Sequence, residues 1–330
     1  MEKRITIKDI AKALNIHHST VSRALSDDVR IKEETKKRVR DFAEEHGYIP
    51  NANALSFREG IRNIIALIVP NVQHRFFSNV ISHITDFAKK EGYIIAVFQS
   101  NESIEEEREI IHNIIQNRFA GVIASLSMET TDVKHFEMLA DFKIPLVLFD
   151  RVNNSLDVPK VIVNSSEMTN HVTSLLIKKG YKKICYLGGT QQITLFQERT
   201  KGYKEAMLNA GLTTVCQEVK EILSKETGEK YSHILAKNCD AFICDSYNMA
   251  LGIHTELKKA GYAIPKEKAI VSFGNDLSAD VLSPSMSLIS QPEEEYAQHT
   301  FSLLLENIKD FNIVKKTKLL NLTFRERESS

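Results

Sequence analysis

Polar side chains near the start of the chain recur at helical spacing in a pattern that suits contact with DNA. One side of a helix over residues 18–25 would carry His18, Ser19, Ser22 and Arg23. The other side would carry the apolar residues Val21, Ala24 and Leu25. An arginine can bind guanine through two hydrogen bonds, and serine or threonine hydroxyls bind phosphate. The spacing fits a helix that enters the major groove, and it fits the plain packing of a helical hairpin equally well.

Two further segments would position this helix. Thr6 and Asp9 have the spacing of a capping box, and apolar residues then recur every three or four positions, so we expect a first helix over Ile7–Leu14. A break at residues 15–17 leads into the segment 18–25, and a third helix is expected over residues 33–46. Two short helices joined by a tight turn are typical of a helix-turn-helix.

The first sixty residues also resemble a known family. The runs TIKDIAKALNIHHSTVSRAL, EETKKRV and GYIPNANA closely resemble the DNA-binding headpiece of the lactose/galactose repressor (LacI) family. The resemblance implies two groups of contacts, which are the base readers His18, Ser19 and Arg23 and the phosphate ligands Thr6, Thr20 and Ser22. His17 is also placed in this DNA-binding motif, although the family usually has a serine there as the N-cap of the recognition helix.

The segment 51–58 connects the third helix to the next apolar strand. Asn51 could cap a short helix that carries Ala54 and Phe57, but so short a helix is marginal in water, and a flexible linker fits the sequence better. In the resembling family this segment is a hinge helix that orders on operator DNA and wedges a leucine into the minor groove. Phe57 stands at that leucine position, so the resemblance implies DNA contacts from Asn51, Ala54 and Phe57.

From residue 64 onward, apolar strand-like runs alternate with amphipathic helical segments. One series of runs lies at Ile64–Val69, 93–98, Gly121–Ala124 and Leu146–Phe149, and a second lies at 161–163, 183–187, Ala241–Cys244 and 270–273. This βα order implies parallel sheets. We therefore expect two similar doubly wound lobes, with the cleft between them as the default ligand site.

The expected architecture is a small all-α helix-turn-helix headpiece followed by an α/β periplasmic-binding-protein-like sensor of two doubly wound parallel-sheet lobes. The likeness to the family's sensor rests on the landmarks FDR at 149–151, QERTKGY at 197–203 and MALG at 249–252. We expect a DNA-binding domain at 1–50, a hinge helix or linker at 51–60 and an effector-binding domain at 61–330. Within that domain, lobe one would take about 61–160 plus 289–320, and lobe two about 161–288 plus 321–330.

Alignment with the family implies an effector site in the cleft. Its members would be His74, Phe76, Phe77, Asp150, Arg151, Arg199, Ser246, Asn275 and Asp276. A carboxylate and a guanidinium facing a cleft can bind sugar hydroxyls, with aromatic rings stacking on the apolar sugar face. Asp150 and Arg199 could instead form a salt bridge between the lobes. Ser246 and Gly274 stand where the family commonly has Asn and Asp, and basic residues gather at the cleft, so an anionic sugar is a further hypothesis.

Composition and motifs exclude several other classes of protein. The chain has 330 residues, 42% of them hydrophobic and 26% charged, which is ordinary for a globular protein of two or three domains. No apolar stretch reaches the ~18 residues of a membrane helix, and the first residues lack a secretory signal, so we expect a cytoplasmic, nucleoid-associated protein. The four cysteines show no metal-ligand spacing, and no GxSxG, HExxH, P-loop or GxGxxG pattern occurs. We therefore expect no metal, no cofactor and no enzymatic activity.

Together these features predict a transcriptional repressor that binds specific DNA and is controlled by a small molecule, a sugar or sugar acid, between its lobes. We expect a homodimer on a roughly palindromic double-stranded operator, because one headpiece alone buries too little surface for specific binding. A tetramer is less expected, since the sequence ends without a leucine heptad. A pure solute-binding protein would explain the lobes but not the helix-turn-helix.

Overall fold

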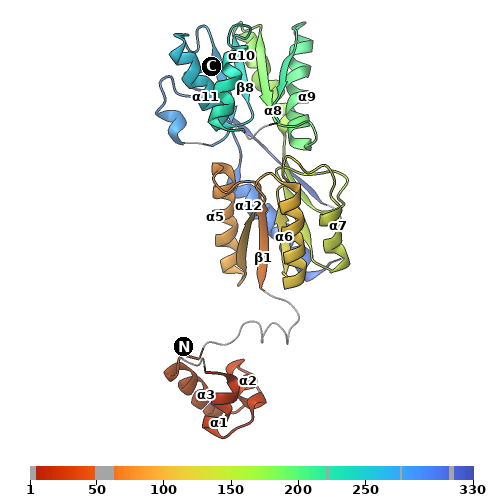
Figure 1. Ribbon diagram of the computed structural model, residues 1–330, viewed down its shortest axis with the longest axis vertical. Helices are drawn as coiled ribbons and strands as arrows, with labels where there is room; N and C mark the ends of the chain where they lie inside the picture. Colours follow the sequence, from red (N-terminus) through yellow and green to blue (C-terminus); the bar gives the residue numbers. More distant parts are fainter. Residues whose placement is uncertain (1–4, 49–62, 221–222, 276, 312–315) are drawn as a thin grey trace. The chain divides into compact units, whose positions relative to one another are not determined.

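The computed structural model describes residues 5–48, 63–220, 223–275, 277–311 and 316–330 (Figure 1). The chain divides into two compact units, with the boundary between residues 62 and 63. In the described part of the chain, no helix is both long and apolar enough to cross a membrane.

The first unit is a cluster of three helices. These are α1 (Ile7–Leu14), α2 (His18–Leu25) and α3 (Glu33–Glu45). They pack around a small apolar core that consists of Ile10, Ala11, Val21, Ala24, Val39 and Ala43. The capping box predicted at the start of α1 is present, because Asp9 N–H donates to Thr6 Oγ1 at 3.3 Å and Thr6 N–H donates to Asp9 Oδ2 at 2.9 Å.

The second unit contains two six-stranded sheets, each covered by helices. The first sheet has the order β11-β5-β4-β3-β1-β2, and every pair of neighbouring strands in it is parallel. Its strands are β1 (Ile64–Val69), β2 (Ile94–Gln99), β3 (Gly121–Ala124), β4 (Leu146–Phe149), β5 (Lys160–Val163) and β11 (Thr317–Leu320). The helices that belong with it are α5 (Arg75–Lys90), α6 (Ile104–Asn117), α7 (Lys134–Asp141) and α12 (Glu293–Lys309).

The second sheet has the order β12-β10-β9-β8-β6-β7, and only its edge strand β12 is antiparallel to its neighbour. Its strands are β6 (Ile184–Gly188), β7 (Val215–Glu218), β8 (Ala241–Cys244), β9 (Ala269–Phe273), β10 (Ser287–Ser290) and β12 (Thr323–Arg325). The helices that belong with it are α8 (Ser165–Lys178), α9 (Thr194–Asn209), α10 (Lys225–Leu235), α11 (Tyr247–Lys259) and the 3-10 helix η1 (Leu277–Asp280). The fold class is therefore the predicted one, a helical headpiece plus two parallel-sheet α/β lobes.

One predicted strand lies in the other lobe. Residues 161–163 were expected to open the second series, but β5 pairs with β4 and β11 in the first sheet. The chain then passes between the sheets after β5, after β10 and after β11. The prediction was wrong because the alternation of strands and helices gives the order of elements along the chain, and only long-range pairing decides which sheet a strand joins.

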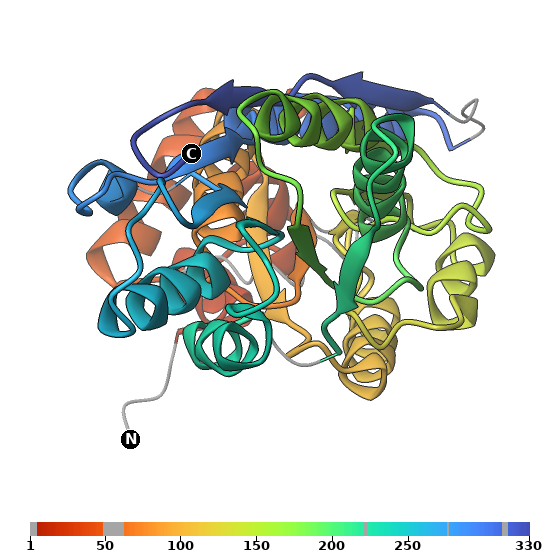
Figure 2. The ribbon, with the colours of Figure 1, turned by 90° about the horizontal axis from the view of Figure 1, so that it is seen from above.

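Close helix packing explains the glycines in two of the landmark motifs, QERTKGY and MALG. Helices α8 and α9 lie side by side, as do α10 and α11 (Figures 1 and 2). A Cβ atom at Gly202 would lie 2.0 Å from the carbonyl oxygen of Ser166, and one at Gly252 would lie 2.0 Å from that of Lys225. No larger residue fits at either position without moving a backbone. Both glycines thus serve the packing of the second lobe.

Candidate functional site

The polar side of α2 is the first candidate site. Val21 and Ala24 are buried against α1 and α3, so the opposite side of α2 is turned to solvent. His18 is exposed there, and Ser19, Ser22 and Arg23 are partly buried. The two predicted phosphate ligands outside this set also reach the surface, with Thr6 exposed at the start of α1 and Thr20 half-buried in α2. The arrangement presents hydroxyl, imidazole and guanidinium groups from a single helix and its neighbour.

His17 takes the N-cap position of α2 that a serine usually fills. Its Nδ1 atom accepts the backbone N–H of Ser19 at 3.4 Å and lies 2.8 Å from Ser19 Oγ. The imidazole ring packs against the ring of His18, with the centroids 4.1 Å apart. An imidazole nitrogen therefore satisfies one of the free N–H groups at the start of the helix, as a serine oxygen would.

Several basic side chains that follow α2 are paired with acids. Asp27 Oδ1 lies 3.0 Å from Lys36 Nζ and 2.6 Å from Arg40 Nη2. The hydrogen bond and charge of Lys36 hold the pKa of Asp27 below its usual value, although the carboxylate is exposed. Arg30 pairs with Asp28 at 2.6 Å. The pair of Asp27 with Arg40 is exposed on both sides and contributes little stability, whereas the Lys36 side chain is buried. The predicted hinge residues Asn51, Ala54 and Phe57 lie outside the described residues.

A cavity of about 320 Å³ in the second unit is the second candidate site. Six of the predicted residues line it: His74, Phe76, Phe77, Asp150, Arg151 and Arg199. Ten further residues also line it: Asn71, Gln73, Glu102, Leu195, Phe196, Leu223, Ser224, Asp245, Asn248 and Gln291. Several lie just beyond the carboxyl ends of parallel strands, where ligands bind in open α/β sheets.

Asp150 lies in the interior at the end of β4. It is 5% exposed and adopts a left-handed backbone conformation with φ of 57°. Its Oδ1 atom accepts a hydrogen bond of 3.1 Å from Nε2 of Gln291, which lies just after β10 where the chain passes between the sheets. Burial raises the pKa of Asp150 above its usual value, although the charges of Arg199 and Arg151 act in the opposite direction. Asp150 therefore links the first sheet to a segment that joins the two lobes.

Arg199 is paired within the second lobe. Its Nη1 atom lies 3.1 Å from Asp245 Oδ1, and its guanidinium carbon lies 3.6 Å from the centre of the Phe273 ring. Asp245 also accepts hydrogen bonds from Tyr186 Oη at 2.6 Å and from the Gly189 N–H at 3.1 Å. The alternative of an ion pair between Arg199 and Asp150 is not found among the described contacts. Asp245 directly follows β8, so the rule that ligands bind at strand ends could have identified it.

Arg151 has a carboxylate partner as well. Its Nη1 atom donates to both oxygens of Glu102, at 2.8 and 2.7 Å. The guanidinium lies over the rings of Phe77 and Phe196, at 5.8 and 5.5 Å from their centres. Burial first, and the charge of Arg151 second, lower the pKa of His74 to about 4, so this imidazole is neutral at pH 7. The lining thus holds two guanidiniums against three carboxylates, and it is not the cationic site that the sequence suggested.

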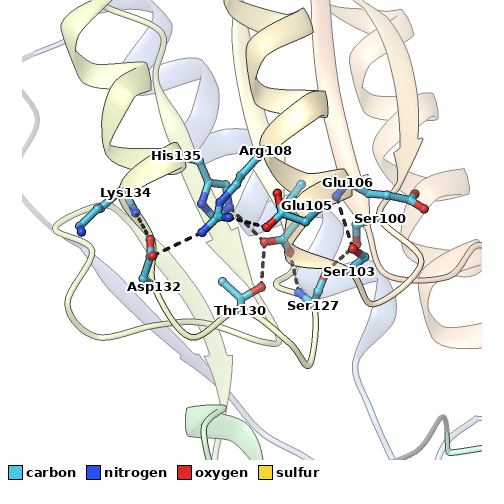
Figure 3. Close-up of polar contacts among 11 residues, drawn as sticks. Ser100, Ser103, Glu105, Glu106, Arg108, Ser127, Thr130, Asp132, Lys134 and His135 are labelled. Atoms are coloured by element: carbon cyan, nitrogen blue, oxygen red, sulfur yellow. Dashed lines mark hydrogen bonds and ion pairs between the residues drawn. The ribbon is translucent and has the colours of Figure 1, made fainter.

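A buried network beside the cavity supports Glu102. The fully buried carboxylate of Glu107 accepts hydrogen bonds from Ser127 N–H at 2.6 Å and Thr130 Oγ1 at 2.7 Å, and it lies 3.1 Å from His135 Nε2. Figure 3 shows Ser127, Thr130 and His135 gathered beside α6. Met128, which follows Ser127, donates its backbone N–H to Glu102 at 2.8 Å. The loop held by Glu107 therefore also fixes the partner of Arg151.

Two predicted effector residues do not line this cavity. Ser246 is buried at the start of α11, where its hydroxyl donates to the carbonyl oxygen of Leu223 at 2.9 Å. Asn275 donates to the carbonyl oxygen of Gln291 at 2.6 Å and lines a separate cavity of about 370 Å³. Position relative to a landmark motif did not reveal which way these side chains point. Asp276 lies outside the described residues.

Comparison with known proteins places this arrangement in a family. Residues 6–51 match the model of bacterial regulatory proteins of the lacI family, and residues 173–330 match a periplasmic binding protein-like domain. The transcriptional repressor PurR of Vibrio vulnificus is 30% identical over 312 residues, which are 92% of each chain. The transcriptional regulator RegA of Clostridium saccharobutylicum is 26% identical over 98% of this chain and 99% of its own.

Solved structures share the fold over the full length. The lac repressor dimer bound to operator and the anti-inducer ONPF has a TM-score of 0.85 at 18% identity, with 99% of each chain covered. The complex of the transcriptional regulator CelR with cellobiose has a TM-score of 0.73 at 22% identity, covering 99% of this chain and 100% of CelR. A helix-turn-helix unit, two parallel-sheet lobes and a relative 30% identical over nearly the whole chain lead to one conclusion: this protein belongs to the lacI family of bacterial transcriptional regulators.

Proposed function

We propose that this regulator is a homodimeric repressor of a roughly palindromic operator and that a carbohydrate in the 320 Å³ cavity controls its operator affinity. The single observation that carries the effector part is the composition of that cavity. Its polar groups include two pairs of a carboxylate with a guanidinium, and three phenylalanine rings lie beside them. Such a lining offers hydrogen-bond donors and acceptors close together, together with an apolar surface, which are the features that sugar rings require.

The proposed DNA contacts follow the two groups expected from the sequence. His18, Ser19 and Arg23 would read base edges in the major groove, because they lie on the side of α2 that faces solvent. The phosphate ligands would be Thr6, Thr20 and Ser22, and the segment 51–60 would add minor-groove contacts. A homodimer follows from the geometry of operators, since two recognition helices bind half-sites one helical turn apart. The dimeric lac repressor on its operator, a neighbour in fold, supports this assembly.

The charges of the cavity favour a neutral sugar over a sugar acid. Each guanidinium already has a carboxylate partner, through Glu102 and Asp245, and the third carboxylate belongs to Asp150. An anionic ligand would meet this excess of negative charge in a buried site, where like charges repel strongly. A hydroxyl group can donate to Asp150 without that cost. The cellobiose complex of CelR supports a carbohydrate, although the shared property is the fold.

A ligand screen on the full-length protein tests the effector class. Neutral sugars, their matched uronic acids and a panel of nucleobases would be compared by thermal unfolding at one concentration. A ligand present at 100 times its Kd stabilises the folded state by about 2.7 kcal/mol. We expect stabilisation by one or more neutral sugars and a weaker effect of the corresponding acid. Stabilisation by acids or nucleobases alone would overturn the assignment.

A further inference from the structure

We propose that His17 fixes the hydroxyl of Ser19 as a hydrogen-bond acceptor and so restricts the operator base that Ser19 reads. The two side chains are held together at the start of α2, with Nδ1 of His17 2.8 Å from Oγ of Ser19 and 3.4 Å from the backbone nitrogen of the same serine. The inference rests on the proposed reading of a base edge by Ser19. It adds a role for His17, whose cap function alone would not affect base choice.

The two contacts decide the direction of the hydrogen bond between the side chains. A backbone N–H can only donate, so the N–H of Ser19 requires an unprotonated Nδ1 on His17. The neutral imidazole then carries its proton on Nε2, and Nδ1 offers only a lone pair. The hydroxyl of Ser19 must therefore be the donor in the 2.8 Å contact. In the opposite tautomer, a proton on Nδ1 would face the backbone N–H of Ser19.

This direction has a consequence for DNA recognition. A free serine hydroxyl can both donate and accept, which lets it approach any base edge. When its proton is committed to His17, only the lone pairs of Ser19 Oγ remain for the DNA. In the major groove, adenine and cytosine present amino groups that donate to such an acceptor, whereas guanine and thymine present only acceptors. We therefore expect adenine or cytosine at the position read by Ser19.

Two contacts hold the His17 ring in the orientation that accepts the Ser19 hydroxyl. It lies against the ring of His18 at a centroid distance of 4.1 Å, which limits its rotation. It also holds the first turn of α2 through the cap, so that His17, Ser19 and the helix start form one unit. An asparagine at position 17 would place an amide oxygen the same number of bonds from the backbone as Nδ1. A glycine would remove the acceptor while remaining a tolerated N-cap residue.

Selection of bound DNA from random duplexes by the full-length protein tests the proposal. Ser19→Ala first identifies the half-site position that Ser19 reads. At that position we expect the wild type and His17→Asn to prefer adenine or cytosine by about three- to tenfold, the range of one hydrogen bond. We expect His17→Gly to lose the preference. The double variant His17→Gly/Ser19→Ala should match Ser19→Ala at that position.

The outcomes separate this proposal from the proposed function. If Ser19→Ala changes one position and His17→Gly leaves that position unchanged, the role of His17 is wrong and the reading by Ser19 stands. If Ser19→Ala changes no position, both fail. A preference of the wild type for guanine or thymine at the Ser19 position also overturns the acceptor assignment. Thermal unfolding of each variant confirms that the headpiece is folded, because a lost cap costs a helix only part of its stability.

Discussion

Arg199 and Asp245 form an ion pair of 3.1 Å inside the second lobe, and their side chains are only 3% and 0% exposed. The pair joins α9 to the end of β8, and it borders the cavity. A buried charge is tolerated only when its partner is present. The position of Arg199 at the ligand site therefore depends on Asp245, a residue that no motif singled out.

Replacement of Asp245 by asparagine should destabilise the protein strongly. Asp245→Asn removes the carboxylate charge that pairs directly with the buried Arg199 guanidinium, which costs about 3–5 kcal/mol. The free energy of unfolding in urea measures the change. Glu229→Gln is the matched control, because Glu229 belongs to a partly exposed i,i+4 pair with Lys225 and should change stability by no more than about 0.5 kcal/mol. Equal changes in the free energy of unfolding for the two variants would show that the buried pair contributes no more stability than the exposed one.

Replacement of Asp150 by asparagine should separate stability from ligand binding. Burial raises the pKa of Asp150 in the folded state, so this group favours folding only at low pH and opposes it once both states are ionised. Asp150→Asn should therefore be more stable than the wild type near pH 7, and the difference should shrink as pH falls toward the ordinary aspartate pKa. Sugar affinity should fall at the same time. Urea unfolding across this pH range and calorimetric titration with the sugar measure both effects.

Two results for Asp150→Asn would contradict this prediction. If Asp150→Asn lost the same stability at every pH, the carboxylate would be needed for packing, and its ionisation would not destabilise the folded state. Unchanged sugar affinity would remove Asp150 from the ligand site.

His74 should make stability depend on pH in the opposite sense. Its pKa falls from the ordinary 6.5 to about 4 in the folded state, so the folded protein resists protonation. Stability is then fully present above pH 6.5 and is lost as pH falls from 6.5 toward 4, by about 3 kcal/mol in all. His74→Gln should reduce this loss, and His171→Gln, at an exposed histidine of α8, should not. The free energy of unfolding in urea, measured at several pH values, tests this prediction. Identical pH profiles for the wild type, His74→Gln and His171→Gln would contradict it.

Glu107 should affect the ligand site without touching it. Glu107→Gln keeps one acceptor oxygen for the Ser127 N–H and turns the other into a donor, so Thr130 and His135 must change from donating to accepting or lose their partner, at a cost of about 1–3 kcal/mol. The loop that holds Glu102 should then move, and sugar affinity should fall. Glu105→Gln is the control on the same helix, because Glu105 pairs with Arg108 on the surface (Figure 3). Unaltered sugar affinity in a destabilised Glu107→Gln would limit the network to a structural role.

The fold class and the local features could be predicted from the sequence, whereas the pairing of residues far apart in the chain could not. The start of α1 followed from Thr6 and Asp9, because a capping box involves residues three positions apart. The partners of Arg151 and Arg199 lie 49 and 46 positions away, so the charge balance of the cavity depended on how the strands come together. The placement of β5 in the first sheet has the same cause. Position 17 was identified as the N-cap only through the family resemblance, and the capping contact of His17 could not be predicted because an imidazole seldom fills that position.

A ligand in the cavity should change the affinity of the headpiece for its operator. The most direct test is the Kd for the selected operator, measured by fluorescence anisotropy at fixed salt with and without the sugar that stabilises the protein. Coupling free energies between sites are typically about 1–3 kcal/mol. We predict a change of at least about fivefold in the wild type and a smaller change in Asp150→Asn at the same sugar concentration. A sugar that binds the cavity and leaves the operator Kd unchanged would contradict the claim.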